Sequence, residues 1–250
     1  MKLYLIGFQR SGTTVLRRLI DMHPDVVCML HEVRLMTHGK DESDVYARAR
    51  RAADKHYGKG VLDEIARAHW GTKVPYVNEP HLVMDRCRRW LEMFPSDGRV
   101  INIVRDPVDT ALSNFKTFQM PHDQFMLAYQ DCMKTLAPDL TTLPPECFRH
   151  VRFEALVTHP QRTLRSLFLW AGLRPEAADT IVTTAGKEHL RYFDCINSKR
   201  AFSWHRKGAE GMKPYLKALK GVARLIDQYA PPEAPNQAYV HSLWLGQRKK

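Results

Sequence analysis

The chain has 250 residues, of which 44% are hydrophobic and 10% aromatic, and its 38 lysines and arginines against 27 aspartates and glutamates give a formal net charge of +11. This composition excludes a disordered or low-complexity chain, because the apolar residues suffice for a large core. The positive charge predicts an anionic partner: nucleic acid, an acidic membrane surface or a polyphosphate-like small molecule.

The cysteines and the first residues bear on the compartment. Five cysteines, an odd number without a Cys-x-x-Cys pair, argue against a disulfide framework and a structural zinc site, and the 12 histidines include no His-Glu-x-x-His pattern. The apolar run at residues 3–8 is far shorter than the roughly 20 residues of a membrane span, and too short for a signal sequence. We therefore expect a cytoplasmic protein, in a reducing compartment, with no metal and no membrane partner.

In the first half of the chain, strands and helices are predicted to alternate. Short apolar runs predict strands at residues 2–8, 26–30 and 70–74, the last ending at Pro75. Helical spacing of apolar residues predicts helices at residues 13–22 and 82–94, and polar, arginine-rich helical sequence fills about residues 42–69. This alternation is typical of a parallel sheet with helices on both faces.

The second half continues the pattern. Residues 99–104 form a nearly continuous apolar run, which indicates a buried strand, and Pro107 fits the first position of a helix that Asp106 would cap. A further strand is expected to end at residues 151–153, followed by helices at 161–170 and about 213–229. No linker divides the chain. We expect an α/β fold in a single domain, residues 1–250, with a central parallel β-sheet flanked by helices as in P-loop NTPases.

The strongest motif lies between the first predicted strand and helix, and its sequence is Gly-Phe-Gln-Arg-Ser-Gly-Thr-Thr (residues 7–14). Gly12 lets the backbone approach an anion, while the first helical turn and the Ser11, Thr13 and Thr14 hydroxyls supply donors. The pattern matches a P-loop except that Thr13 replaces the lysine that reaches the cleaved phosphates of ATP or GTP. Here Arg10 supplies the positive charge.

A second motif begins at the carboxyl end of the strand at residues 99–104. Arg105 ends that strand and Ser113 follows about two helical turns later, so the two can converge on a second phosphate. Arg105 could instead form a structural ion pair with Asp106 or Asp109, and the sequence leaves both readings open.

Together these motifs resemble the sulfotransferases that use 3′-phosphoadenosine 5′-phosphosulfate (PAPS), especially the bacterial and tyrosylprotein types. Residues 10–14 followed by His23-Pro24 look like the 5′-phosphosulfate loop, and Arg105 with Ser113 looks like the 3′-phosphate site. Weaker likenesses are Lys73-x-Pro75, the segment Val-Arg-Phe-Glu-x-Leu at residues 151–156, and a basic glycine segment in about residues 186–213, an arm that would close over the cofactor. That segment contains Arg206, Lys207 and Gly208.

The resemblance implies sulfuryl transfer to a hydroxyl or amine of a small-molecule or carbohydrate acceptor, without metal. Arg10 would neutralise charge on the 5′-phosphate and sulfuryl oxygens, and Lys73 would contact the bridging oxygen. Glu32 is favoured as the base with His31 second, although Glu32 could simply pair with Arg34. The acceptor is expected to bind between about residues 34–69, an insertion or lid, and residues 119–147.

Three other functions fit the sequence less well. A P-loop-like kinase, the main alternative, predicts Mg²⁺-dependent ATP turnover. A nucleic-acid-binding module would place aromatic and basic residues on one face, whereas the basic residues here lie at predicted strand ends, so no nucleic acid partner is expected. Cys28 and Arg34 have the spacing of cysteine-dependent phosphatases, but the residues between them offer no glycine-bearing phosphate loop.

Overall fold

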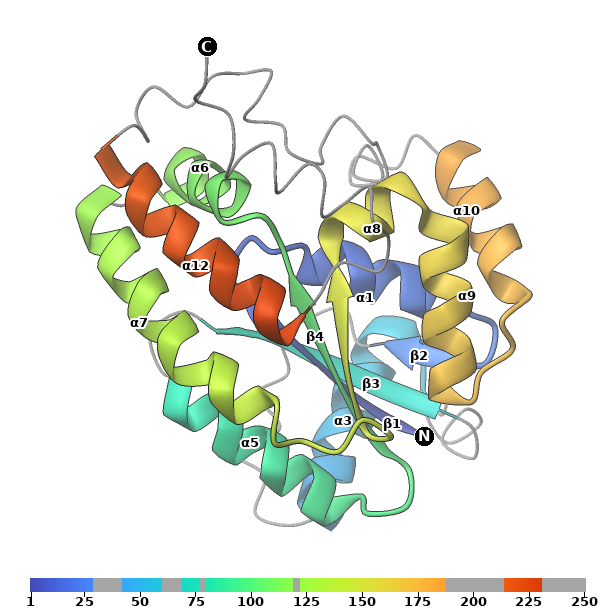
Figure 1. The fold of residues 1–250 in the computed structure, drawn as a ribbon. Coiled ribbons are helices and arrows are strands. Elements are labelled where there is room, and N and C mark those ends of the chain that lie inside the picture. The colour runs from blue at the N-terminus through green and yellow to red at the C-terminus, as the bar shows by residue number, and fades with distance from the viewer. Residues whose placement is uncertain (29–41, 60–68, 77–79, 119–121, 188–213, 231–250) are drawn as a thin grey trace.

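The fold is built on one parallel sheet, as the alternation of elements predicts. The computed structural model describes residues 1–28, 42–59, 69–76, 80–118, 122–187 and 214–230, and within them five strands pair in the order β2-β3-β1-β4-β5 (Figure 1). All four strand pairs are parallel. The strands are β1 (Lys2–Phe8), β2 (Val26–Cys28), β3 (His69–Tyr76), β4 (Gly98–Val104) and β5 (Phe148–Arg152).

Alternate side chains of the strands enter two cores, one on each face of the sheet. Along β1, Tyr4, Ile6 and Phe8 join the first core, whereas Leu3 and Leu5 join the second. This period of two is the geometry of a strand, and burial of both faces explains why β1 and β4 are nearly continuous apolar runs.

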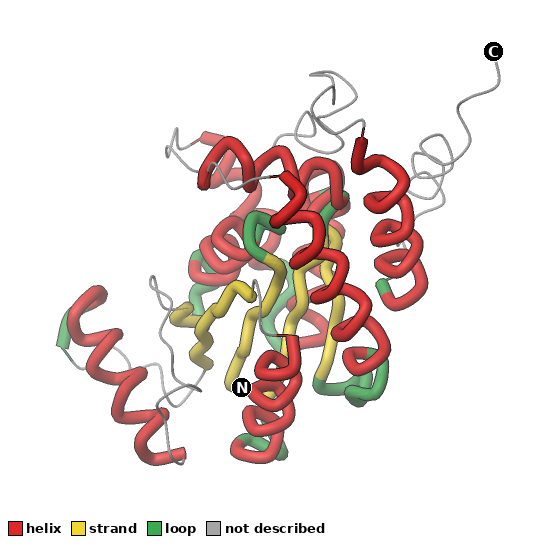
Figure 2. Tube along the Cα trace, turned by 90° about the vertical axis from the view of Figure 1, so that its left-hand side faces the viewer, coloured by secondary structure: helices red, strands yellow, loops and turns green. Residues whose placement is uncertain are grey.

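Helices cover both faces (Figures 1 and 2). The first core receives side chains from the helices on one face, and the second core from those on the other. On the first face lie α3 (Glu42–Tyr57), α5 (Pro80–Met93), α6 (Pro107–Phe118), α7 (His122–Leu140) and α12 (Leu216–Tyr229). On the second lie α1 (Thr13–Asp21), α8 (Phe153–Thr158), α9 (Pro160–Ala171) and α10 (Ala177–Lys187).

Helix boundaries follow local chemistry. Asp106 caps α6 as predicted, because its Oδ1 accepts hydrogen bonds from the amides of Val108 (2.9 Å) and Asp109 (3.0 Å). The helix α9 ends where Gly172 takes a left-handed conformation with φ of 72°. Within the described residues, no helix has both the length and the apolar character needed to cross a membrane.

Several predicted boundaries were wrong. His69 begins β3 instead of ending a helix, and β3 continues through Pro75 to Tyr76. In the described part of the chain β2 pairs only with residues 69–71, so at Pro75 no ladder with β2 is interrupted. Phe153 begins α8, whereas the sequence pattern predicts that it ends a strand.

The helices α7 and α10 are not among the predicted elements. The sequence pattern assigns residues 119–147 to the acceptor pocket, yet α7 contributes Phe125, Tyr129 and Leu136 to the first core. Phe8 at the end of β1 packs against two of these side chains, with ring centroids 5.8 Å from Phe125 and 4.3 Å from Tyr129. The helix therefore supports the end of β1.

Candidate functional site

The candidate site lies at the carboxyl edge of the sheet, between the ends of β1 and β4. The strands β2 and β3 lie on one side of β1 in the sheet, and β4 and β5 lie on its other side. The strand order therefore changes direction at β1. Ligands of open parallel sheets bind in the crevice at such a reversal. The segments that leave this edge are Gln9–Gly12 before α1, Arg105-Asp106 before α6, and Phe153-Glu154 at the start of α8 (Figure 1).

The loop after β1 is a tight turn. The amide of Ser11 donates to the carbonyl of Phe8 at 3.0 Å, and both Arg10 (φ 71°) and Gly12 (φ 109°) have left-handed backbones. A Cβ atom on Gly12 would lie 2.4 Å from Cδ2 of Phe153, so the position requires glycine for its space as well as its conformation. Its carbonyl accepts the first hydrogen bond of α1, from Leu16 at 3.0 Å.

This turn has the features of an anion cradle. The helix α1 starts at Thr13 and has no side-chain cap, so its first turn presents backbone amides toward the loop. Ser11 is 1% exposed, and its Oγ has no hydrogen-bond partner among the described residues. A buried hydroxyl without a partner costs stability unless a ligand or water satisfies it. The residues therefore fit a bound phosphate.

Hydrogen bonds join this loop to the segment after β4. Arg10 donates through Nε to Oγ of Ser113 at 3.2 Å, and Arg105 donates through Nη1 to the carbonyl of Arg10 at 3.3 Å. Asn114 donates through Nδ2 to the carbonyl of Gln9 at 3.5 Å. Three predicted site residues, Arg10, Arg105 and Ser113, thus lie close together in the structure, and their binding roles stay predictions.

The contacts of Arg105 bear on whether it binds an anion or forms a structural ion pair. Asp106 is occupied with capping α6, and Nη2 of Arg105 lies 3.8 Å from Oδ2 of Asp109, a loose contact. Its guanidinium carbon stands 4.4 Å from the centroid of the Phe153 ring, and its Nε is buried without a partner in the described part of the molecule. This arrangement favours an anion-binding role over a purely structural ion pair.

Two buried acids, Asp106 and Glu154, interact electrostatically with Arg105. Burial, followed by the charges of Asp109 and Glu154, raises the pKa of Asp106 well above its usual range, and burial also raises the pKa of Glu154. Oε1 of Glu154 accepts a hydrogen bond from the Asp106 amide at 2.8 Å. A raised pKa favours the neutral acid, which weakens repulsion of an anion held by Arg105.

Other predicted site residues are not placed. Glu32, His31, Arg206, Lys207 and Gly208 lie outside the described residues. For Lys73 the structure gives the backbone, in β3 opposite Leu5, but its side chain lies outside the described part. The roles assigned to these residues stay predictions.

Sequence reasoning missed three neighbours of the site: Phe153, Glu154 and Asn114. The first two belong to the segment at residues 151–156, whose only signal in the sequence is its likeness to a family. Their contacts with Arg105 and Asp106 depend on β5 lying beside β4, which local patterns do not reveal.

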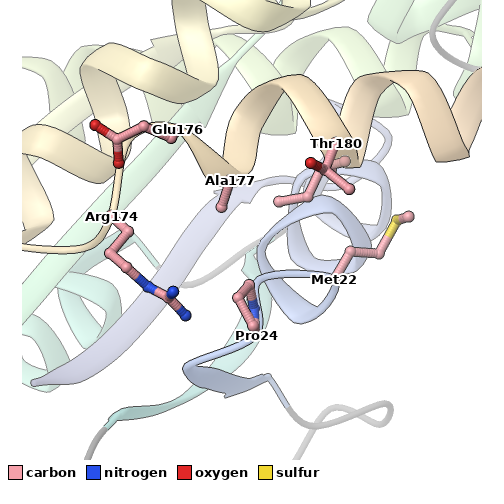
Figure 3. Close-up of a pocket in the computed structure, with 7 residues that line it drawn as sticks. Met22, Pro24, Arg174, Glu176, Ala177 and Thr180 are labelled. Atoms are coloured by element: carbon pink, nitrogen blue, oxygen red, sulfur yellow. The ribbon is translucent and has the colours of Figure 1, made fainter.

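A surface hollow of about 450 Å³ lies elsewhere. Met22 and Pro24, after α1, line it together with residues at the start of α10 (Figure 3). These residues precede β2 or follow α9, at the opposite edge of the sheet from Arg10 and Arg105. The hollow is therefore not part of the candidate site.

Comparisons with known proteins agree with this geometry. A model of the sulfotransferase family matches residues 3–177. Protein-tyrosine sulfotransferase 1 of Danio rerio is 24% identical over an alignment of 183 residues, and the match covers 66% of this chain and 51% of that protein. The chain therefore spans about half the length of this curated relative.

Two solved structures share the fold. A sulfotransferase domain from the curacin biosynthetic pathway has a TM-score of 0.61 at 18% identity, with 92% of this chain and 98% of that chain covered. A mouse sulfotransferase complexed with PAP has a TM-score of 0.56 at 14% identity, with 96% and 88% covered.

Proposed function

Because the chain belongs to the sulfotransferase family, we propose that it transfers a sulfuryl group from PAPS to a hydroxyl or amine of a small-molecule or carbohydrate acceptor. The choice of donor is supported by the mouse structure of the same fold, which is complexed with PAP (3′-phosphoadenosine 5′-phosphate, the desulfated product of PAPS). PAPS carries two separated anionic groups, the 5′-phosphosulfate and the 3′-phosphate. We assign the loop after β1 to the 5′-phosphosulfate, and Arg105 with Ser113 to the 3′-phosphate, as two cradles.

One observation carries the proposal: the contact of Arg10 with Ser113 at 3.2 Å links the loop after β1 to the helix after β4. Because β1 and β4 are adjacent strands, roughly 4.8 Å apart, both cradles lie within reach of one nucleotide. A nucleoside triphosphate has contiguous phosphates and would need the P-loop lysine, whose position is occupied by Thr13.

The proposed sulfuryl transfer assigns a different role to each of the candidate site residues. In the proposed reaction the bond between sulfur and the bridging oxygen breaks, a bond from the acceptor oxygen or nitrogen to sulfur forms, and negative charge accumulates on the departing 5′-phosphate. In our proposal Arg10 and the first-turn amides of α1 stabilise that charge; their contacts at the start of α1 support this role. In our proposal Lys73 contacts the bridging oxygen, and Glu32, or else His31, accepts the acceptor proton.

Calorimetric titration with PAP, without metal, tests the donor site. We expect micromolar binding that ATP does not reproduce, and loss of binding in Arg10→Ala and Arg105→Ala. Tighter, Mg²⁺-dependent binding of ATP would instead support a kinase, and the absence of PAP binding would refute the proposal.

Glu32→Gln separates binding from chemistry. The variant should bind PAP like the wild type and lose turnover, because the amide cannot accept the proton. A fully active Glu32→Gln enzyme would transfer the role of base to His31, which His31→Asn then tests by the same two measurements.

A further inference from the structure

The two residues that follow β5 contact the two residues that follow β4. Val104 and Arg152 are partners in register, so the chain leaves both strands side by side. The ring of Phe153 faces the guanidinium of Arg105 at 4.4 Å, and Glu154 accepts the hydrogen bond of the next amide at 2.8 Å. One dipeptide therefore contacts both the side chain of Arg105 and the peptide that carries it.

The ring of Phe153 lies against both Arg105 and the loop after β1. It is 2% exposed, and it lies so close to Gly12 that a Cβ there would approach to 2.4 Å. The ring is thus wedged against the loop and cannot yield in that direction. The guanidinium rests on its face and is held on another side by the carbonyl of Arg10 at 3.3 Å. Such a contact fixes the direction of a cation.

Glu154 holds the backbone of the same segment. Glu154 is 1% exposed, and it accepts a hydrogen bond from the backbone amide of Asp106, which directly follows Arg105. Its second oxygen has no partner within the described residues. The contact needs only an acceptor oxygen, which a glutamine also provides.

We propose that Phe153 and Glu154 are positioning residues that orient Arg105 and thereby make the protein select nucleotides with a 3′-phosphate. This inference rests on the proposed function, in which Arg105 binds that phosphate. Neither residue touches the reacting atoms in this scheme. Their effect is therefore on the preference for PAP over adenosine 5′-phosphate (AMP), which lacks the 3′-phosphate.

The ratio of the dissociation constants of AMP and PAP, measured by calorimetry, isolates this effect. For the wild type we expect a ratio of about 100 or more, as hydrogen bonds to a charged phosphate would give. Phe153→Leu should lower the ratio about tenfold through loss of the ring face, because the affinity for PAP falls more than the affinity for AMP. Phe153→Tyr, which keeps the ring, should preserve the ratio.

Phe168→Leu is the matched control, because Phe168 is a buried phenylalanine of the same core that contacts His23 instead of Arg105. It should leave the ratio unchanged. Should Phe153→Leu fail to fold, Glu154→Leu against Glu154→Gln gives the same comparison, with the ratio lost in the first and kept in the second.

The outcomes are distinct. A wild type that binds PAP and AMP equally would overturn the proposed function together with this inference. A wild type that prefers PAP, with the ratio unchanged in Phe153→Leu and Glu154→Leu, would overturn the inference alone. A ratio that falls as much in Phe168→Leu would also overturn it, because the loss would then reflect general destabilisation.

Discussion

Replacing Gly12 by alanine tests the geometry of the loop after β1. The residue has φ of 109°, and the left-handed side of the backbone map costs an alanine about 1–2 kcal/mol. The new Cβ would also lie 2.4 Å from the Phe153 ring, and overpacking of this kind costs about 1–3 kcal/mol. We therefore expect the free energy of unfolding to fall by roughly 2–5 kcal/mol.

Two other glycines separate these contributions. Gly172 has φ of 72°, but a Cβ there would meet no atom of the described residues within 4 Å, so Gly172→Ala should show the backbone cost alone, about 1–2 kcal/mol. Gly221 lies in α12 with the same open space, and Gly221→Ala should stabilise the protein by up to about 1 kcal/mol.

Thermal unfolding by calorimetry measures all three variants. At roughly 2–4 °C per kcal/mol for a chain of this size, Gly12→Ala should lower Tm by about 4–20 °C. Equal losses in Gly12→Ala and Gly172→Ala would refute the steric part of the argument. A double-mutant cycle with Phe153→Ala checks the contact directly, since removal of the ring should recover part of the loss at Gly12, a coupling of about 1–2 kcal/mol.

Two further predictions concern titratable groups. Burial lowers the pKa of His150 to about 3, so its neutral form contributes stability that is complete above about pH 6.5 and is lost, at up to about 1.4 kcal/mol per unit, as the pH falls toward 3. In urea denaturation the wild type should therefore lose stability relative to His150→Asn as the pH falls from 7 to 4. A difference in stability that stays constant over this range would contradict the prediction. Asp106→Ala should cost about 1 kcal/mol through loss of the α6 cap. Asp106→Asn keeps the cap and should gain stability relative to the wild type as the pH rises, because the raised pKa makes ionisation of the buried acid unfavourable; urea denaturation showing equal losses in both variants would count against the cap.

The strands that carry the site were predictable from the sequence. Residues 2–8 and 99–104 are nearly continuous apolar runs because both faces of β1 and β4 are buried, and such runs stand out from the polar segments around them. Segments with weaker local signals were less predictable. In α7, Phe125, Tyr129 and Leu136 have helical spacing, but Pro138 lies inside the helix, where a proline normally indicates a helix boundary.

The site itself was predictable only in part. The sequence placed Arg10 and Arg105 after two different strands, and the structure brings them together because the carboxyl ends of parallel strands meet at one edge. The support from Phe153 and Glu154 was not predicted, since it follows from the order of β4 and β5 in the sheet. A single sequence contains the strands but not their order.

The position of β1 in the sheet also bears on the dynamics of the loop that follows it. This strand is hydrogen-bonded on both sides, to β3 and β4, and its side chains from Leu3 to Ile6 are buried. Amides in such a strand exchange with solvent mainly when the whole domain unfolds. The loop therefore begins at one of the slowest-exchanging parts of the molecule. A nucleotide bound there would protect the entire sheet from hydrogen exchange, and not the loop alone.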